Sequence, residues 1–426
     1  EPQTAITSYW MVRDGSGPLT SETPIFGAPW RIPFELPLFQ YLAAQLSRVG
    51  IGLDHAGRIV SGLLFLLCLP VMARIADRVG LTDAQRNALL ALAITSPIYV
   101  TYAFAFSIES TALLLSLLYV ERWIAWERDR SPWSLLFSVL AGLLAAACKT
   151  TTWAVWAAVI GVVVVARVAA ALRRKEIDAR TVAGRILVLA LPLSAGALWT
   201  LYAEAVRSAN PIAAEGLSSS ALAAWFFGTL TQKLSPTEWA FYLGRSLVTV
   251  LGVAAPVAVV LAGMKAASSR MAWKDHCPLL AVAAAGFLAG PVVFTNLHFV
   301  HDHYVFASGV LLLFAVVTPF RERAPRWLLV ILVASNLATL AGYLYLKQVN
   351  YDDPLNRHIA SAVRDLPEEC TIVVLGALFD AYVPYESGHK ALQATPAGDD
   401  DPAYWQAVAL TRAEGICGVV AKGDRF

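Results

Sequence analysis

A single glutamate, Glu35, stands between two prolines in the stretch IPFELPLFQYL. A carboxylate can take a proton from a hydroxyl group, so an isolated one in an apolar and aromatic setting is a candidate general base. Pro33 and Pro37 restrict the backbone on either side of it. The simpler alternative is a surface ion pair with Arg31, four residues earlier in the chain.

Other ionisable residues stand at the ends of long apolar runs, where charge is expensive and functional sites are common. Glu109 begins one run and Lys149 ends the next, Arg58 begins another, and His301 and Asp302 belong to the short segment NLHFVHDHY. Each has a simpler alternative as well. Glu109 could stabilise a helix N-terminus, Lys149 could be an interface lysine that extends toward water, and the histidine segment could be a polar turn or part of a metal site.

The composition is that of a membrane protein. Of the 426 residues, 57% are hydrophobic and 15% are charged, and the mean hydropathy is +0.58. A soluble domain carries about 25% charged residues. Runs that are apolar all around a helix predict an all-α bundle of about ten spans. We expect these spans at 57–78, 86–103, 106–125, 133–148, 151–171, 183–204, 238–264, 277–295, 303–320 and 326–346.

The distribution of positive charge predicts the orientation of these spans. With the first segment outside, the inner loops hold 18 lysines and arginines and the outer loops hold three. This asymmetry places residues 1–56 and everything after about 346 outside. We expect one further membrane span before Glu1. Nothing in the charge pattern indicates nucleic-acid binding.

The candidate residues fall on one side of the membrane in this arrangement. Acids, a lysine, an arginine and histidines converge on the outer face, whereas the inner ends of the spans hold arginines without a comparable mixture of residue types. The expected parts are an irregular first external loop (1–56) with an amphipathic helix from Pro37 to Gly50, the bundle (57–346), and an external tail (347–426). A second interfacial helix is expected at ALAAWFFGTL, residues 221–230.

The tail has the pattern of a small α/β domain. A helix after Asp353, a strand at CTIVVLG, a helix at DPAYWQAVALTRAEG and a strand at ICGVVAK alternate along it. Cys370 and Cys417 stand at the beginnings of the two strands. Neighbouring parallel strands could bring them into a disulfide on the oxidising side of the membrane, or leave two reduced thiols in adjacent strands.

Several of these segments resemble motifs of the GT-C membrane glycosyltransferases, in particular the protein O-mannosyltransferase and lipid A aminoarabinose transferase group. IPFELPLFQYL is similar to their first external loop, where a Phe-Glu-x-Pro stretch precedes a helix at the membrane surface. The opening segment EPQTAITSYWMVRDG, SIESTALLLSLL, CKTTTWAVW and HFVHDHYVF resemble further motifs in the same order. In CKTTTW a threonine replaces the usual glycine, and His303 replaces a more usual tyrosine.

The resemblance implies an integral membrane enzyme, in the bacterial inner (plasma) membrane, that transfers a hexosyl or pentosyl group outside the cell. The donor would be a polyprenyl-phosphate sugar and the acceptor a glycolipid, glycan or protein, with inversion at the sugar. Glu35 and Glu1 are the candidate catalytic carboxylates. The candidate substrate-binding residues are Lys149, Arg58, Glu109, His301, Asp302 and Tyr304. A divalent cation is a candidate cofactor. The alternative is a transporter or lipid-binding membrane protein, which should place ionisable groups near mid-span, where only Arg245 looks moderately deep.

Overall fold

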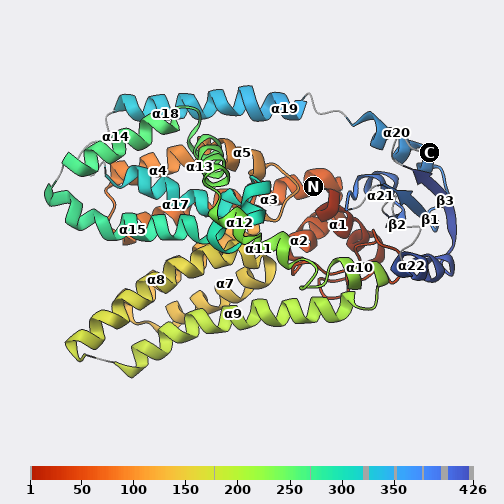
Figure 1. The fold of residues 1–426 in the computed structure, drawn as a ribbon, viewed down its shortest axis with the longest axis horizontal. Coiled ribbons are helices and arrows are strands. Elements are labelled where there is room, and N and C mark those ends of the chain that lie inside the picture. Colours follow the sequence, from red (N-terminus) through yellow and green to blue (C-terminus); the bar gives the residue numbers. More distant parts are fainter. Residues whose placement is uncertain are drawn as a thin grey trace.

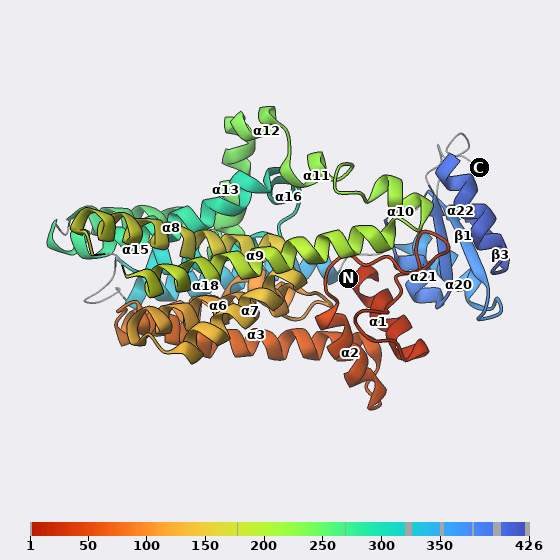
Figure 2. The same ribbon diagram turned by 90° about the horizontal axis from the view of Figure 1, so that it is seen from below.

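The computed structural model describes residues 2–176, 178–268, 270–319, 326–349, 353–376, 379–394 and 402–421. Glu1, and the loop arginines Arg321 and Arg323 of the predicted charge pattern, lie outside the described residues. The described part is an elongated bundle of helices with a small sheet at one end (Figure 1). The first helices of the chain lie beside that sheet (Figure 2).

Long helices form the body of the molecule. In chain order they are α3 (Leu53–Arg78), α4 (Asp83–Thr95), α5 (Pro97–Ala103), α6 (Glu109–Asp129), α7 (Pro132–Cys148), α8 (Thr150–Arg174), α9 (Ala179–Arg207), α13 (Pro236–Leu251), α14 (Ala255–Ser268), α15 (Arg270–Val293), α17 (Val305–Val317), α18 (Arg326–Thr339), the π-helical turn η1 (Leu340–Tyr345) and α19 (Leu346–Val349). Among the described residues, α3, α8 and α9 are long and apolar enough to cross a membrane, and four shorter apolar helical stretches accompany them.

Two of the predicted spans are broken in the structure. The span at 86–103 is divided at Ser96, which is extended because Pro97 follows it and disfavours a helical conformation there. The span at 238–264 is divided at Gly252, where φ is +76° and a Cβ atom would approach Ser335 Oγ at 2.4 Å. Local backbone chemistry therefore overrides a continuous apolar pattern at both places.

The N-terminal segment, predicted from the sequence to be an irregular loop, is more ordered than its turn-rich sequence indicates. Residues Pro2–Asp14 form helix α1, which packs on α2 (Leu38–Arg48) and on α21 (Tyr382–Ser387). Ile6 and Trp10 of this helix are buried in a cluster with Ile25, Phe26 and Ile32, which stabilises it, so the prediction of an irregular segment was wrong here. The helix predicted from Pro37 to Gly50 is present as α2. The second predicted one is reduced to α11 (Ala223–Phe227), which lies between α10 (Pro211–Gly216) and α12 (Leu230–Leu234).

The tail contains a three-stranded parallel sheet with strand order β2-β1-β3. The two predicted strands are β1 (Thr371–Leu375) and β3 (Ile416–Ala421), and the predicted helices are α20 (Pro354–Arg364) and α22 (Pro402–Arg412). Strand β2 (Lys390–Ala394) was not predicted, because KALQA has little β-branched or aromatic character.

The segment that precedes α2 pairs with the edge of this sheet formed by β2. Phe26 forms an antiparallel bridge to Leu392, and the backbone of residues 24–27 exchanges hydrogen bonds of 3.0 Å with that of Ala391 and Gln393. Gly27 has φ +77°, and a Cβ atom there would lie 2.6 Å from Thr411 Oγ1, so glycine is required. This pairing joins the first loop to the tail at the end of the bundle that carries Glu35.

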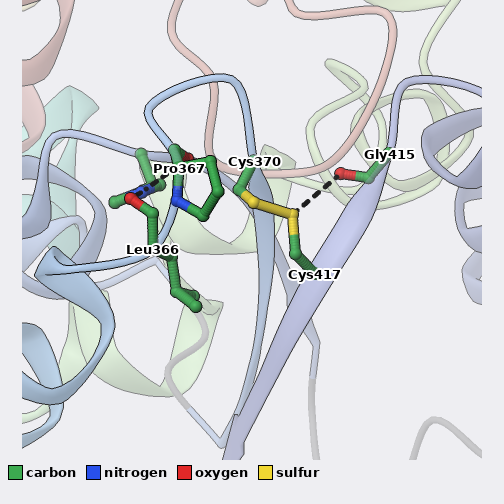
Figure 3. The surroundings of a disulfide bond; sticks show 6 residues. Leu366, Pro367, Cys370, Gly415 and Cys417 are labelled. Carbon is green, nitrogen blue, oxygen red and sulfur yellow. Dashed lines mark hydrogen bonds between the residues drawn. A yellow bond between two sulfur atoms is a disulfide. The ribbon is translucent and has the colours of Figure 1, made fainter.

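Cys370 and Cys417 form a disulfide bond with a Cα–Cα distance of 5.6 Å (Figure 3). The register of β1 and β3 shifts between Thr371 and Ile372, so Cys417 is the extra residue of a bulge. The disulfide that the sequence left open is thus formed, and it ties the outer strand β3 to the start of β1.

Candidate active site

The segment that carries Glu35 is held against the bundle by its own backbone. The amide of Leu36 donates a hydrogen bond of 3.0 Å to the carbonyl of Ala147, near the end of α7. From α9, Trp199 Nε1 donates to the carbonyl of Phe34 at 3.3 Å and Arg207 donates to that of Pro33 at 3.0 Å. These contacts fix the segment on both sides of the carboxylate, next to the helix that ends at Lys149.

The carboxylate of Glu35 is half-buried and accepts a hydrogen bond of 2.8 Å from Gln40 Nε2. Burial raises the pKa of Glu35 above its usual value, while the Gln40 hydrogen bond and the charge of Lys149 act in the opposite direction. The surface pair with Arg31 is not formed. Arg31 instead donates to the carbonyl of Leu19 at 2.6 Å and to the hydroxyl of Tyr202 at 3.0 Å.

Lys149 and Glu109 form a buried ion pair between two helix ends. Lys149 is the single residue between α7 and α8, and Glu109 is the first residue of α6. Their side chains are 11% and 4% exposed, so Lys149 does not extend toward water as an interface lysine would. Its ammonium also lies 4.8 Å from the centre of the Tyr304 ring.

The histidine segment forms a compact turn between α15 and α17 that includes the short helix α16 (Thr295–Val300). Asp302 accepts a hydrogen bond of 2.7 Å from the hydroxyl of Tyr102 in α5. Arg245 of α13 donates to the backbone carbonyls of this turn, at 3.1 Å for Phe299 and 3.3 Å for His301, and also to that of His298. The deep arginine noted in the sequence therefore organises the turn.

His301 is half-buried, and its ring stands 5.8 Å from that of Trp225 in α11. Burial lowers the pKa of His301, and the charges of Arg245 and Lys149 lower it further, against the effect of Asp302. A neutral imidazole at pH 7 can donate or accept a hydrogen bond from a sugar or phosphate without adding charge. Among the described residues, no group of three or more His, Cys, Asp or Glu side chains could hold a metal ion.

The predicted site residues are brought together to different degrees. Glu35, Glu109 and Lys149 lie close enough for their charges to act on one another, and Tyr304 joins them through its ring. Arg58 is exposed near the start of α3, where its charge acts on Tyr385 of the tail. Its charge is not among those that act on Glu35, so Arg58 is not brought together with that group of residues.

The residues that sequence reasoning missed are the partners of these groups: Gln40, Tyr102 and Trp225. Gln40 carried a weak signal, as a polar residue in the first turn of an apolar helix that follows Glu35. Nothing in the sequence connects Tyr102 with Asp302, which lies 200 residues later.

Comparisons with known proteins agree with this picture at the level of the fold. No family model and no curated protein matches the chain. The solved structure of ArnT from Cupriavidus metallidurans bound to undecaprenyl phosphate is similar, with a TM-score of 0.63 and 13% identity over 98% of this chain and 84% of that one.

Two further solved structures match less well. ArnT from the same organism in the apo state gives a TM-score of 0.45 and 15% identity, over 98% of this chain and 84% of that one. The arabinofuranosyltransferase AftD from Mycobacteria gives a TM-score of 0.47 and 15% identity, over 87% of this chain and 27% of that one. The chain therefore shares its overall fold with the ArnT structure that holds undecaprenyl phosphate.

Proposed function

We propose that this protein is an integral membrane glycosyltransferase that takes its sugar from a polyprenyl-phosphate donor. The observation that carries the proposal is the convergence of Glu35 with the Lys149–Glu109 pair, from three segments far apart in the sequence. A carboxylate of raised pKa beside a buried ammonium supplies the two groups that transfer from a lipid phosphate needs. The likeness in fold to a structure that holds undecaprenyl phosphate supports the donor class.

Lys149 is the proposed phosphate-binding group. An ammonium has three hydrogen-bond donors, and Glu109 uses one of them. The remaining donors can face a phosphate that gains negative charge as the bond to the sugar breaks, and a fixed cation stabilises that charge in the transition state. Arg58 and the turn of His301 and Asp302 would border the donor.

Glu35 is the proposed base. The acceptor hydroxyl attacks the anomeric carbon and gives its proton to the Glu35 carboxylate, while the bond between that carbon and the phosphate oxygen breaks. The electron pair leaves with the polyprenyl phosphate, and attack opposite the leaving group inverts the anomeric centre. The acceptor is a glycolipid, a glycan or a protein that reaches the outer face of a bacterial inner membrane.

The test is transfer by the purified full chain in lipid nanodiscs, with undecaprenyl-phosphate sugars as donors and release of undecaprenyl phosphate as the readout. Glu35→Gln should reduce transfer by at least about a hundredfold. Glu215→Gln, an exposed acid on α10, should not change it. Binding of the donors without release of undecaprenyl phosphate would favour the transporter or lipid-binding alternative, and normal transfer by Glu35→Gln would exclude Glu35 as the base.

A further inference from the structure

The end of the bundle opposite to the candidate site contains two buried glutamates in α6, Glu121 and Glu127, with side chains 0% and 3% exposed. Each carboxylate contacts several arginines. Arg78 lies 2.9 Å from Glu121, and Arg185 lies 2.8 Å from Glu127. The arginines of this cluster are Arg74, Arg78, Arg122, Arg130, Arg167 and Arg185. The sequence predicted arginines at this end of the bundle, but not their pairing with two buried glutamates.

The acids do not neutralise the arginines. Six arginines contact two glutamates, and a surplus of positive charge remains even when the nearby Asp129 is counted. Arg74, Arg130 and Arg167 are each nearly half exposed at the helix ends. Exposed positive charge at a membrane surface attracts anionic lipid headgroups. The surplus therefore favours an anionic partner from outside the chain.

A cavity of about 420 Å³ adjoins this cluster, between α3, α6, α8, α15 and α17. Helices α8 and α15 diverge toward this end of the molecule (Figure 1). Fourteen of the 18 lining residues are apolar, among them Trp123 and Trp156, and the four charged ones are three arginines and Glu127. The volume is within the range of protein sites for single ligands.

The charged lining residues lie toward one end of the cavity. Arg78 is the last residue of α3, and Arg128 is in the last turn of α6. Along α6 the lining runs from Val120 to Arg128, which is about 12 Å of helix. The side chain of Arg128 is exposed and has no hydrogen bond or ion pair within the part of the chain that the structure describes.

We propose that this cavity binds one anionic phospholipid, with an acyl chain against Trp123 and Trp156 and its phosphate at Arg128 and Arg167. An apolar interior with cations at one end matches such an amphiphile. The phosphate of a sugar donor at Lys149 is a different group, because Glu109 and Glu127 are 18 residues apart on one helix, a distance of about 27 Å. The surplus of positive charge selects a net anionic lipid over a zwitterionic one.

The experiment is native mass spectrometry of the full chain in detergent micelles, titrated with dioleoyl phosphatidylglycerol or with dioleoyl phosphatidylcholine. The phosphatidylglycerol should bind more tightly than the phosphatidylcholine. Arg128→Gln should weaken phosphatidylglycerol binding about fivefold, the effect of about 1 kcal/mol for one arginine near an anionic lipid. Arg173→Gln, an exposed arginine of α8 that does not line the cavity, should leave it unchanged.

A second variant tests the role of the apolar lining of the cavity. Val163→Trp should narrow the cavity and reduce phosphatidylglycerol binding. If this variant does not fold, Arg128→Gln, at an exposed position, still provides the test. Equal affinity for the two lipids, or equal effects of Arg128→Gln and Arg173→Gln, would overturn the proposal. So would displacement of the phosphatidylglycerol by one equivalent of undecaprenyl phosphate, which would assign the cavity to the donor. Glycosyl transfer is measured separately, so failure here leaves the proposed function intact.

Discussion

The ammonium of Lys149 and the carboxylate of Glu109 meet across three helix ends, the end of α7 and the starts of α8 and α6. Glu109 stands at a helix N-terminus, where the helix dipole favours a negative charge. Lys149 is fixed by its place between two helices, so under the proposed function the pair would set where the donor phosphate binds.

Replacing Lys149 by methionine should abolish donor binding and should also destabilise the protein. Removal of one partner leaves the other as an uncompensated buried charge, at a cost of about 3–5 kcal/mol. Lys149→Arg should keep part of the donor affinity, since a guanidinium can replace a point charge only in part. Binding of undecaprenyl phosphate and the thermal unfolding midpoint measure the two effects.

The double variant Lys149→Met with Glu109→Gln separates stability from function. It removes both charges, so it should unfold at a higher temperature than Lys149→Met alone and still not bind the donor. Lys233→Met, which replaces a half-buried lysine of α12, is the control. Donor binding by Lys149→Met that equals that of the parent would reduce the residue to a structural role.

The pH dependence of transfer should reflect the raised pKa of Glu35. A general base acts only when ionised, so transfer should fall as the pH is lowered through that pKa, with a midpoint above the ordinary value of 4.5. The Gln40 hydrogen bond lowers this pKa, so Gln40→Ala should move the midpoint to higher pH. Gln45→Ala, on the same helix, is the control, and an unchanged midpoint in Gln40→Ala would argue against Glu35 as the base.

The raised pKa of Glu35 also predicts how Glu35→Gln changes the stability of the protein. Because burial raises the pKa of Glu35, the folded state binds the proton more tightly than the unfolded state does, and the ionised carboxylate costs free energy at neutral pH. Glu35→Gln should therefore have an unfolding midpoint at pH 7 no lower than that of the parent. A large decrease would mean that the loss of transfer reflects misfolding.

Tyr102→Phe should reduce transfer by about tenfold or more, because it removes the hydrogen bond that orients Asp302. Hydrogen bonds to charged groups contribute about 1.5–3 kcal/mol. The fold should persist, since only one hydroxyl is lost. Tyr345→Phe, an exposed tyrosine, is the control for the assay. Equal rates for Tyr102→Phe and the control would remove the Asp302 turn from the site.

The sequence predicted which charged residues form this site, because the short motifs that carry them all fall on one side of the predicted membrane bundle. Glu35, Glu109 and Lys149 all stand at helix ends on one side, and the structure brings their charges together. The sequence alone could not predict that Gln40 contacts Glu35 or that Tyr102 contacts Asp302, because tertiary packing decides which side chains meet. The same holds for helix α1 and strand β2, whose weak local preferences are overridden by burial against the rest of the first loop and the tail. The arginine–glutamate cluster in α6 was missed because Glu121 and Glu127 lie beside arginines in the sequence and read as a solvated helix end.

The disulfide between Cys370 and Cys417 should hold the outer strand β3 in place. Among the residues that the structure describes, strand β3 pairs only with β1. The disulfide bond closes a loop of 47 residues, which in the chain-entropy model contributes about 4 kcal/mol. Reduction, or Cys417→Ala, should accelerate amide hydrogen exchange in residues 416–421 at least about tenfold, read by mass spectrometry. Cys277→Ala, which removes a free thiol, should have no such effect.

Thiol labelling checks the disulfide bond itself: of the five cysteines, the unfolded, unreduced protein should label only Cys68, Cys148 and Cys277. Labelling of all five without reductant would show that the bond does not form, and exchange unaffected by reduction would show that β3 is held by packing alone.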